Sequence, residues 1–134
     1  MLLEIDHHSG QPIYRQVIDQ IRQQIMAGQL HEGEQLVTVR DLAGQLRVNP
    51  MTISKAYALL ELEGLLERQR GIGLFVAKID GEQKEQTKEN LLEDLLRQAA
   101  VMAVQFDIPQ SKAADMLAEL YEKYDSKARK SKNG

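Results

Sequence analysis

The sequence predicts a mainly α-helical chain that carries one small β-hairpin and ends in a helical region. Three observations predict this fold class. Apolar residues recur at spacings of three and four in three segments between residues 13 and 60, as they do in amphipathic helices. Two short β-like runs follow at residues 65–69 and 73–77. Two further helical patterns then extend to residue 124, separated by a break at residues 107–109.

The composition is that of an ordinary globular protein. The chain has 134 residues, is 43% hydrophobic and 28% charged, and carries a formal net charge of -3. It contains no cysteine, which excludes a disulfide scaffold, thiolate catalysis and cysteine-ligated metal sites. No apolar run approaches the roughly 18–20 residues of a membrane span, and the start of the chain lacks the features of a signal peptide. We therefore expect a cytoplasmic protein without a membrane segment.

The first helix is expected to begin at Ile13 and to end near Gly28. Pro12 suits the start of a helix, because the N–H that it lacks would be unpaired there. An apolar stripe follows at a spacing of four: Ile13, Val17, Ile21 and Ile25. Gly28 adopts the left-handed conformation of a helix C-terminus at little cost. Before this helix, the weak alternation of residues 2–5 is compatible with a short edge strand.

The next two helices are expected to form a helix-turn-helix. The Thr38 hydroxyl can cap the first of them, with Asp41 at the capping-box position. Residues 47–48 make a tight turn, and Asn49 and Pro50 then open the following helix as its N-cap and first residue. In a helix-turn-helix, the second of the two helices enters the major groove of DNA with its N-terminal residues toward the base edges.

This third helix of the chain differs from the rest in charge. Between Arg47 and Leu60 there are two basic residues and no acidic residue, although the whole chain is acidic. Short polar groups and a cation suit close approach to base edges and phosphates, which an acidic residue would repel. The residues predicted at this surface are Asn49, Met51, Thr52, Ser54 and Lys55. The same pattern also fits an ordinary helix with a capped start and a solvated face.

The hairpin and the second helix add further cations. Arg68, Arg70 and Gly71 lie at or near the predicted hairpin tip, where they can approach a minor groove or a phosphate closely. Arg40, on the second helix, is a further positively charged contact of this kind. So few cations predict only a modest electrostatic contribution to DNA affinity in each protomer.

Metal, cofactor and enzyme sites are not expected. His7, His8 and His31 lie near predicted loops, and no pair has the helical spacing and carboxylate partner of a metal site. Gly71 and Gly73 do not open a helix and no Lys-Ser/Thr follows them, which argues against a phosphate loop. No nucleophile and base can be paired from the sequence. We therefore expect no metal, no cofactor and no enzymatic activity.

The C-terminal helical region is expected to form a homodimer. Its doubled leucines, at residues 91–92 and 95–96, give a wider apolar face than one partner needs. Two-fold dimers are the commonest soluble oligomers, and a dimer makes the second DNA-binding event intramolecular. The alternative is that the region packs only against its own N-terminal domain. The predicted dimerisation residues are Leu91, Leu92, Leu95, Leu96, Ala99, Met102, Ala103, Phe106, Leu117, Leu120 and Tyr121.

Two domains are therefore expected, a DNA-binding domain at residues 1–78 and a helical dimerisation region at residues 79–134. Residues 79–86 are polar and are expected to form a linker or a frayed helix start, with Thr87 as the cap of the helix that follows. Residues 126–134 contain four basic residues and no acidic residue, and are expected to form a disordered tail.

Two stretches of the chain resemble the GntR family of bacterial transcription regulators. They read PIYRQVIDQIRQQIMAGQL (residues 12–30) and VTVRDLAGQLRVNPMTISKAYALLELEGLLERQRGIGLFV (residues 37–76). The short chain with Asn-Pro, then TISKAY and a C-terminal region of two helices, is similar to the YtrA subfamily. Together with the patterns above, the resemblance predicts a winged helix-turn-helix, with the hairpin as wing, followed by a C-terminal helical dimerisation region.

The resemblance implies DNA contacts from the start of the second helix, the recognition helix and the wing tip. On this chain these places fall on Thr38 and Arg40, on Asn49, Pro50, Met51, Thr52, Ser54 and Lys55, and on Arg70 and Gly71, with Arg68 and Gly73 as neighbours. Thr38 stands where the family usually has Ser, and keeps a hydroxyl that can cap the helix and contact a phosphate. Ile72 and Leu74 stand where a basic or polar residue and a Thr are usual. A hydrophobic wing tip suits contacts with sugars or protein more than with phosphates.

We therefore expect a transcription regulator that binds a pseudo-palindromic operator as a homodimer and represses by covering a promoter. The subfamily resemblance implies a target operon that often encodes a membrane transporter. Two alternatives stay open. In one, an apolar pocket between the C-terminal helices takes a small effector that changes the spacing of the two DNA-binding heads. In the other, the winged helix serves protein–protein contact, in keeping with the acidic net charge.

Overall fold

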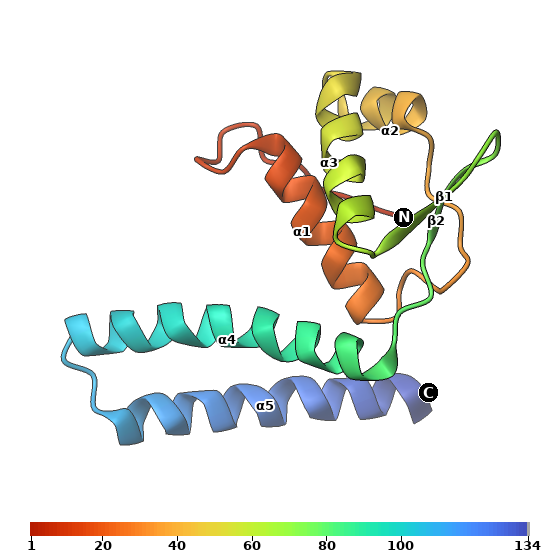
Figure 1. Ribbon diagram of the computed structural model, residues 1–134. Coiled ribbons are helices and arrows are strands. Elements are labelled where there is room, and N and C mark those ends of the chain that lie inside the picture. Colours follow the sequence, from red (N-terminus) through yellow and green to blue (C-terminus); the bar gives the residue numbers. More distant parts are fainter. Residues whose placement is uncertain (134) are drawn as a thin grey trace. The chain divides into compact units, whose positions relative to one another are not determined.

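Five helices and one antiparallel hairpin make up the described part of the chain (Figure 1). The computed structural model describes the backbone of residues 1–133 and the side chains of residues 1–125. The elements are α1 (Ile13–Met26), α2 (Val39–Leu46), α3 (Pro50–Leu62), β1 (Leu66–Gln69), β2 (Gly73–Val76), α4 (Gly81–Gln105) and α5 (Gln110–Asn133). This confirms the predicted fold class. The chain divides into two compact units, Met1–Lys88 and Glu89–Gly134.

Helix α3 lies at the centre of the first unit. It packs against α1 and α2 and contacts β1. Its buried face consists of Ile53, Ala56, Tyr57 and Leu60. The apolar stripe of α1 supplies Val17, Ile21 and Ile25, each at most 2% exposed. Burying such a side chain completely stabilises the fold by about 1.5–3 kcal/mol. Because one face of α3 belongs to this core, the opposite face of its N-terminal half is left to solvent.

Local side chains set the starts of α2 and α3, as predicted. Thr38 Oγ1 accepts a hydrogen bond of 3.1 Å from the backbone N–H of Asp41. Asn49 Oδ1 accepts one of 2.8 Å from the N–H of Met51. Each bond satisfies an N–H group that a helix start leaves unpaired, and such a cap contributes about 1 kcal/mol. The two helices of the helix-turn-helix therefore begin where their capping residues stand.

The turn between α2 and α3 closes with a left-handed residue other than glycine. Arg47 has a φ of 57° and is exposed. The next N–H, that of Val48, bonds to the carbonyl of Ala43 at 3.0 Å and so completes the C-terminus of α2. Asp107, with a φ of 56°, follows α4 in the same way. A left-handed L-residue costs roughly 1 kcal/mol, so both turns are formed against a local backbone preference.

The wing is a hairpin with a third segment beside it. Strands β1 and β2, of four residues each, pair in antiparallel register, which confirms the predicted hairpin. On the other side of β2, residues 33–36 form backbone hydrogen bonds with Leu74 and Val76. Strand β2 is therefore held on both sides, and residues 70–72 form the connecting tip of the wing.

Residues 2–5 do not form the edge strand that their alternation suggests. Backbone groups of the N-terminal segment bond instead to three α1 side chains, the glutamine ladder: Gln16, Gln20 and Gln24. Glu4 exchanges two hydrogen bonds with Gln20, and Asp6 exchanges two with Gln16. Four helical residues rise about 6 Å and two extended residues about 6.6 Å. Alternate residues of the segment therefore meet successive glutamines, which take the place of a neighbouring strand.

Helix α4 begins earlier than predicted. Asp80 Oδ1 accepts a hydrogen bond of 2.8 Å from the backbone N–H two residues on, as a capping side chain does. Residues 79–86, expected to form a linker or a frayed helix start, are therefore a helix start, with the helix beginning at Gly81. Thr87, the predicted cap, lies inside the helix and donates its hydroxyl hydrogen to the carbonyl of Gln83. The carboxylate of Asp80 provides the cap at the start of the polar segment, so the prediction at Thr87 is wrong.

Helices α4 and α5 form an antiparallel pair (Figure 1). No residue of α4 is buried. The large apolar residues that stay exposed on the two helices, or directly after α4 in the case of Phe106, are Leu92, Leu95, Leu96, Val101, Met102, Val104, Phe106, Met116, Leu117, Leu120, Tyr121 and Tyr124. Within the described residues, neither this pair nor any other helix has the length and apolar character needed to cross a membrane.

The predicted basic tail, residues 126–134, begins within the C-terminal part of α5. Its backbone continues α5 as far as Asn133. Its side chains and the whole of Gly134 lie outside the described residues. The expected disorder of this tail stays a prediction.

Candidate nucleic-acid interface

The start of α3 presents most of its predicted contact residues to solvent. Asn49, Pro50, Met51, Ser54 and Lys55 are exposed, and Thr52 is half-buried. Met51 is 76% exposed, although it is a large apolar residue. The core residues of α3 interleave with this set, so burying them turns the other side chains outward. The structure therefore gathers the predicted residues of α3 at one end of the helix, on its solvent face.

The two capping side chains keep their hydrogen-bond donors available. Asn49 uses its amide oxygen to cap α3, which leaves the NH₂ group to donate. Thr38 uses its hydroxyl oxygen as acceptor for α2, which leaves the O–H to donate. Phosphate oxygens and most major-groove base atoms are acceptors. The two helix starts therefore combine a structural role with the chemistry that DNA recognition needs.

A buried tyrosine fixes the start of α2 against α3. The Tyr57 hydroxyl donates a hydrogen bond of 2.6 Å to the carbonyl of Val37, the residue before Thr38. Burial raises the pKa of Tyr57, because the phenolate would have to lose its water. The phenol therefore stays protonated and continues to donate. This bond therefore fixes the segment before Thr38 to α3.

Lys55 lies over an aromatic ring of another helix. Its Nζ is 3.9 Å from the ring centroid of Tyr14, on the first turn of α1. The guanidinium carbon of Arg15 lies 5.7 Å from the same centroid. Neither Tyr14 nor Arg15 is among the residues that the sequence predicts for the site. Residues 14 and 55 are far apart in the chain, so no spacing pattern connects them.

The wing carries one cation in an ion pair and another at its tip. Arg68 on β1 is exposed and pairs with Glu61 at 3.2 Å, which offsets part of its charge. Arg70 and Gly71 are exposed at the tip, beside Ile72, which is 63% exposed. The tip thus presents a guanidinium and an apolar side chain together.

A side chain from the third segment supports the wing tip. Gln35 Nε2 donates a hydrogen bond of 3.3 Å to the carbonyl of Ile72. A Cβ on Gly73 would lie 2.9 Å from the same nitrogen, and Gly73 has a φ of 149°. Glycine at this position therefore allows Gln35 to reach the tip.

Two further arginines stand beside the recognition helix. Arg40 is exposed on the first turn of α2, as predicted for a contact residue. Arg47 is exposed in the turn before α3. The sequence places Arg47 in a turn but not in the site. Its position between the two helices of the helix-turn-helix adds a cation to this face.

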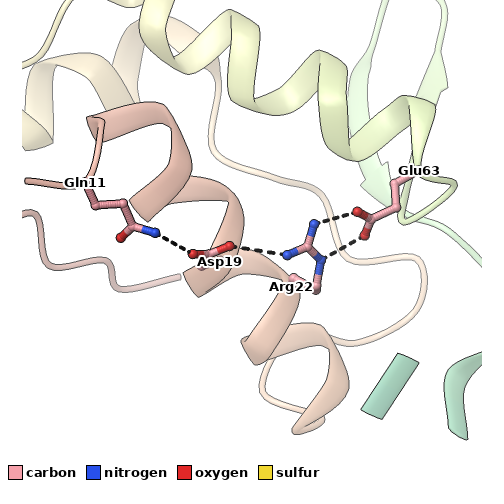
Figure 2. Close-up of polar contacts among 4 residues, drawn as sticks. All are labelled: Gln11, Asp19, Arg22 and Glu63. Atoms are coloured by element: carbon pink, nitrogen blue, oxygen red, sulfur yellow. Dashed lines mark hydrogen bonds and ion pairs between the residues drawn. The ribbon is translucent and has the colours of Figure 1, made fainter. Parts of the chain in front are cut away.

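An ion-pair network fixes the far end of α3 to α1. Arg22 on α1 donates two hydrogen bonds to the Glu63 carboxylate, of 2.9 and 2.5 Å, and one of 3.3 Å to Asp19 (Figure 2). Gln11 donates to the other oxygen of Asp19 at 2.9 Å. The hydrogen bonding of Arg22 to the Glu63 carboxylate raises the pKa of Arg22, although partial burial opposes it. The network is partly exposed, so its contribution to stability is modest, but it orients the recognition helix.

No metal site accompanies these residues in the described part of the chain. There, no group of three or more His, Cys, Asp or Glu side chains is placed to hold a metal ion. The surface instead combines cations, hydrogen-bond donors and two exposed apolar residues at helix starts and a hairpin tip. That combination suits the phosphates, base edges and sugars of duplex DNA.

Comparisons with known proteins agree with this geometry. The family model described as "Bacterial regulatory proteins, gntR family" matches residues 13–76. The "HTH-type transcriptional repressor YtrA" of Bacillus subtilis (strain 168) is 31% identical over 119 residues, which cover 89% of this chain and 92% of that protein. Such coverage of both chains includes the C-terminal helices as well as the winged helix-turn-helix.

Solved structures extend the comparison to the fold. A GntR family transcriptional regulator from Listeria monocytogenes has a TM-score of 0.75 and 30% identity, and the match covers 86% of this chain and 98% of that chain. The DNA-binding domain of AraR in complex with operator ORX1 has a TM-score of 0.51 and 32% identity, over 56% of this chain and 96% of that chain. The relatives from Bacillus subtilis and Listeria monocytogenes are named as a transcriptional repressor and a transcriptional regulator, in line with the expectation that the chain is no enzyme. The predicted resemblance is confirmed: the chain belongs to the GntR family of bacterial regulatory proteins and is a DNA-binding transcription regulator.

Proposed function

We propose that this regulator is a cytoplasmic repressor that binds a pseudo-palindromic operator as a homodimer and acts by covering a promoter. The observation that carries the proposal is the solvent face at the start of α3, which is free of acidic residues and flanked by exposed arginines. The similarity to a protein named as the repressor YtrA supports repression. The subfamily resemblance further suggests a target operon that encodes a membrane transporter.

The proposed contacts divide by chemistry. Lys55, Arg40 and Arg70 suit phosphates, and the hydroxyl of Thr38 can donate to another. The remaining proposed contacts with bases, sugars or phosphates are Asn49, Pro50, Met51, Thr52, Ser54, Arg68 and Gly71. The first turns of α3 contain no arginine, so they lack the residue that most often reads guanine. Met51 instead offers an apolar group, which suits the methyl group of thymine.

A second copy of this chain is the proposed partner of α4 and α5. Leu95 of α4 is 64% exposed, Phe106 directly after α4 is 65% exposed and Leu117 of α5 is 45% exposed. The two helices have no other partner within the second unit. A soluble chain rarely leaves so large an apolar surface open, and two such helix pairs can form a four-helix bundle. The proposed interface residues are Leu91, Leu92, Leu95, Leu96, Ala99, Met102, Ala103, Phe106, Leu117, Leu120 and Tyr121.

An effector pocket is the second candidate use of the same surface. A groove of about 520 Å³ lies between α4 and α5 and is lined by Leu96, Ala99, Ala100, Met102, Ala103, Ile108, Gln110, Ala113, Ala114, Met116, Leu117 and Leu120. Its volume suits a small molecule, but such sites usually place several polar groups among the apolar ones. Gln110 is the single polar side chain in this lining. The lining therefore favours packing against a second copy.

The test is fluorescence anisotropy of the full chain on DNA from upstream of its own gene. A scrambled duplex of the same length is the control, and both are measured at two salt concentrations. Specific binding should be tight and should weaken as salt rises, because phosphate contacts release counterions. If the upstream DNA is not preferred, the operator is to be selected from a random duplex pool. No salt-sensitive binding to any duplex would refute the proposed function in favour of the protein-contact alternative.

A further inference from the structure

The ring of Tyr14 faces the cation of the recognition helix. Lys55 Nζ lies 3.9 Å from its centroid, well inside the limit of about 6 Å for a cation–π contact. Tyr14 is half-buried on α1, whereas Lys55 is exposed on α3. The ion pairs found among residues 1–125 do not include Lys55. The aromatic ring is therefore what holds the ammonium group in this place.

A lysine side chain that is held in place loses less conformational entropy on binding a phosphate than a free one does. The side chain of lysine is long and flexible, and ordering it on a phosphate loses conformational freedom. A ring that already confines Nζ removes part of that loss before DNA arrives. The ammonium group has three N–H donors, and a ring face on one side leaves donors directed elsewhere.

We propose that Tyr14 is a positioning residue of the DNA interface, whose ring holds Lys55 Nζ beside the start of α3 for a DNA phosphate. The inference rests on the proposed DNA contact of Lys55. It brings α1 into the interface without requiring Tyr14 to touch DNA. The attraction between an ammonium and a ring at an exposed site is weaker than that between an ammonium and a phosphate. The ring therefore guides Lys55 and does not withhold it from DNA.

The experiment compares ring substitutions with and without the lysine. Tyr14→Phe keeps the ring, and Tyr14→Leu keeps apolar bulk without it. Pentafluorophenylalanine at position 14 keeps the ring shape and reverses its quadrupole, on which the attraction depends. Each change is made in the wild-type chain and in Lys55→Met, and DNA affinity is measured by anisotropy on the selected operator duplex. Thermal unfolding of every variant checks the fold.

The expected pattern is specific to a positioning role. Tyr14→Phe should bind as the wild type does, whereas Tyr14→Leu and the fluorinated ring should weaken binding about two- to fivefold. In the Lys55→Met background neither change should have a further effect. Lys55→Met should also lower the slope of log affinity against log salt by about 0.9, as the loss of one phosphate contact does.

Other outcomes separate this inference from the proposed function. Equal losses from Tyr14→Leu in both backgrounds would overturn the inference, because the effect would then be independent of Lys55. Tighter binding of Tyr14→Leu would overturn it as well, because the ring would then withhold the lysine. If Tyr14→Leu unfolds, the fluorinated ring decides alone. Arg15→Gln is the matched control, since it removes a cation near the same ring and should leave the response to fluorination intact. A wild-type chain that binds no DNA would count against the proposed function itself.

Discussion

The two units of the chain place similar apolar residues in opposite environments. Leu60 of α3 is fully buried, whereas Leu117 of α5 is 45% exposed and Leu95 of α4 is 64% exposed. Helix α3 packs against two helices and contacts β1, but α4 and α5 have only each other within their unit. Hydrophobic periodicity therefore predicts a helix in both cases, but it does not tell whether the surface that packs against the helix belongs to the same chain.

The largest expected effect concerns the exposed apolar surface. Leu117→Glu should convert the proposed homodimer to a monomer, because a charge in an apolar interface loses its water. Loss of the second DNA-binding head should weaken operator binding by about 10²–10⁴-fold. Analytical ultracentrifugation and anisotropy measure the two effects. Glu119→Gln, an exposed substitution on the same helix, is the control. A dimer that persists in Leu117→Glu would contradict the proposed interface.

The next effect concerns Leu60, the buried leucine of α3. Leu60→Ala should lower the free energy of unfolding of the first unit by about 2–5 kcal/mol, through lost burial and a cavity in the core. Urea denaturation followed by circular dichroism measures it. Leu62→Ala is the matched control, since Leu62 lies on the same helix and is 84% exposed. Similar losses from both substitutions would mean that the core of α3 is not as described.

A smaller effect depends on pH. Burial raises the pKa of Tyr57, so the folded state holds the phenol proton more tightly than the unfolded state. The corresponding stability is present below the unfolded pKa of about 10 and declines as pH rises beyond it. Tyr57→Phe should cost about 1 kcal/mol at neutral pH through the lost hydrogen bond to Val37, and should flatten the alkaline decline. Unfolding free energies of both proteins from about pH 8 to 11 provide the measurement, and parallel decline would contradict the assignment.

The smallest effect concerns the exposed apolar residue of the first unit. Met51 is 76% exposed, but it stands alone at the start of α3, unlike the contiguous apolar residues of α4 and α5. If it contacts a thymine methyl, replacing that thymine by uracil should weaken binding by roughly fourfold, the effect of burying one methyl group. Met51→Ala should remove this difference. Anisotropy on duplexes with single uracils tests it, and no sensitive thymine in the operator would refute the contact.

Local signals account for what could be predicted from the sequence. The caps at Thr38 and Asn49 and the left-handed Gly28 depend on a few adjacent residues, and the structure has all three as expected. The start of α4 is harder to predict, because Asp80 and Thr87 both offer capping side chains and only one can begin the helix. Capping propensity alone does not tell which of these two residues begins the helix.

The contacts that could not be predicted join residues far apart in the chain. Tyr14 with Lys55 and Arg22 with Glu63 are each separated by 41 residues, and neither pair follows a helix or strand period. They arise because α1 and α3 pack against each other along their length. This tertiary packing cannot be read from a local sequence pattern. The charge pattern of α3 predicts a DNA-contact surface, but it contains no sign of the α1 residues Tyr14 and Arg22 that contact this helix.

The glutamine ladder has a consequence for which substitutions the N-terminal segment can accept. The segment contributes backbone groups to the ladder, so the ladder does not restrict the side chains at positions 2 and 4. At position 6 the side chain has a role of its own, because Asp6 Oδ1 accepts a hydrogen bond of 2.9 Å from the N–H of His8. Proline is the exception at positions 4 and 6, since it has no N–H to donate. The helix contributes amides, whose donor and acceptor are both used at Gln16 and Gln20, and glutamate in their place would lose the donor. Side-chain substitutions on α1 should therefore disturb this attachment more than substitutions at positions 2 and 4 of the N-terminal segment.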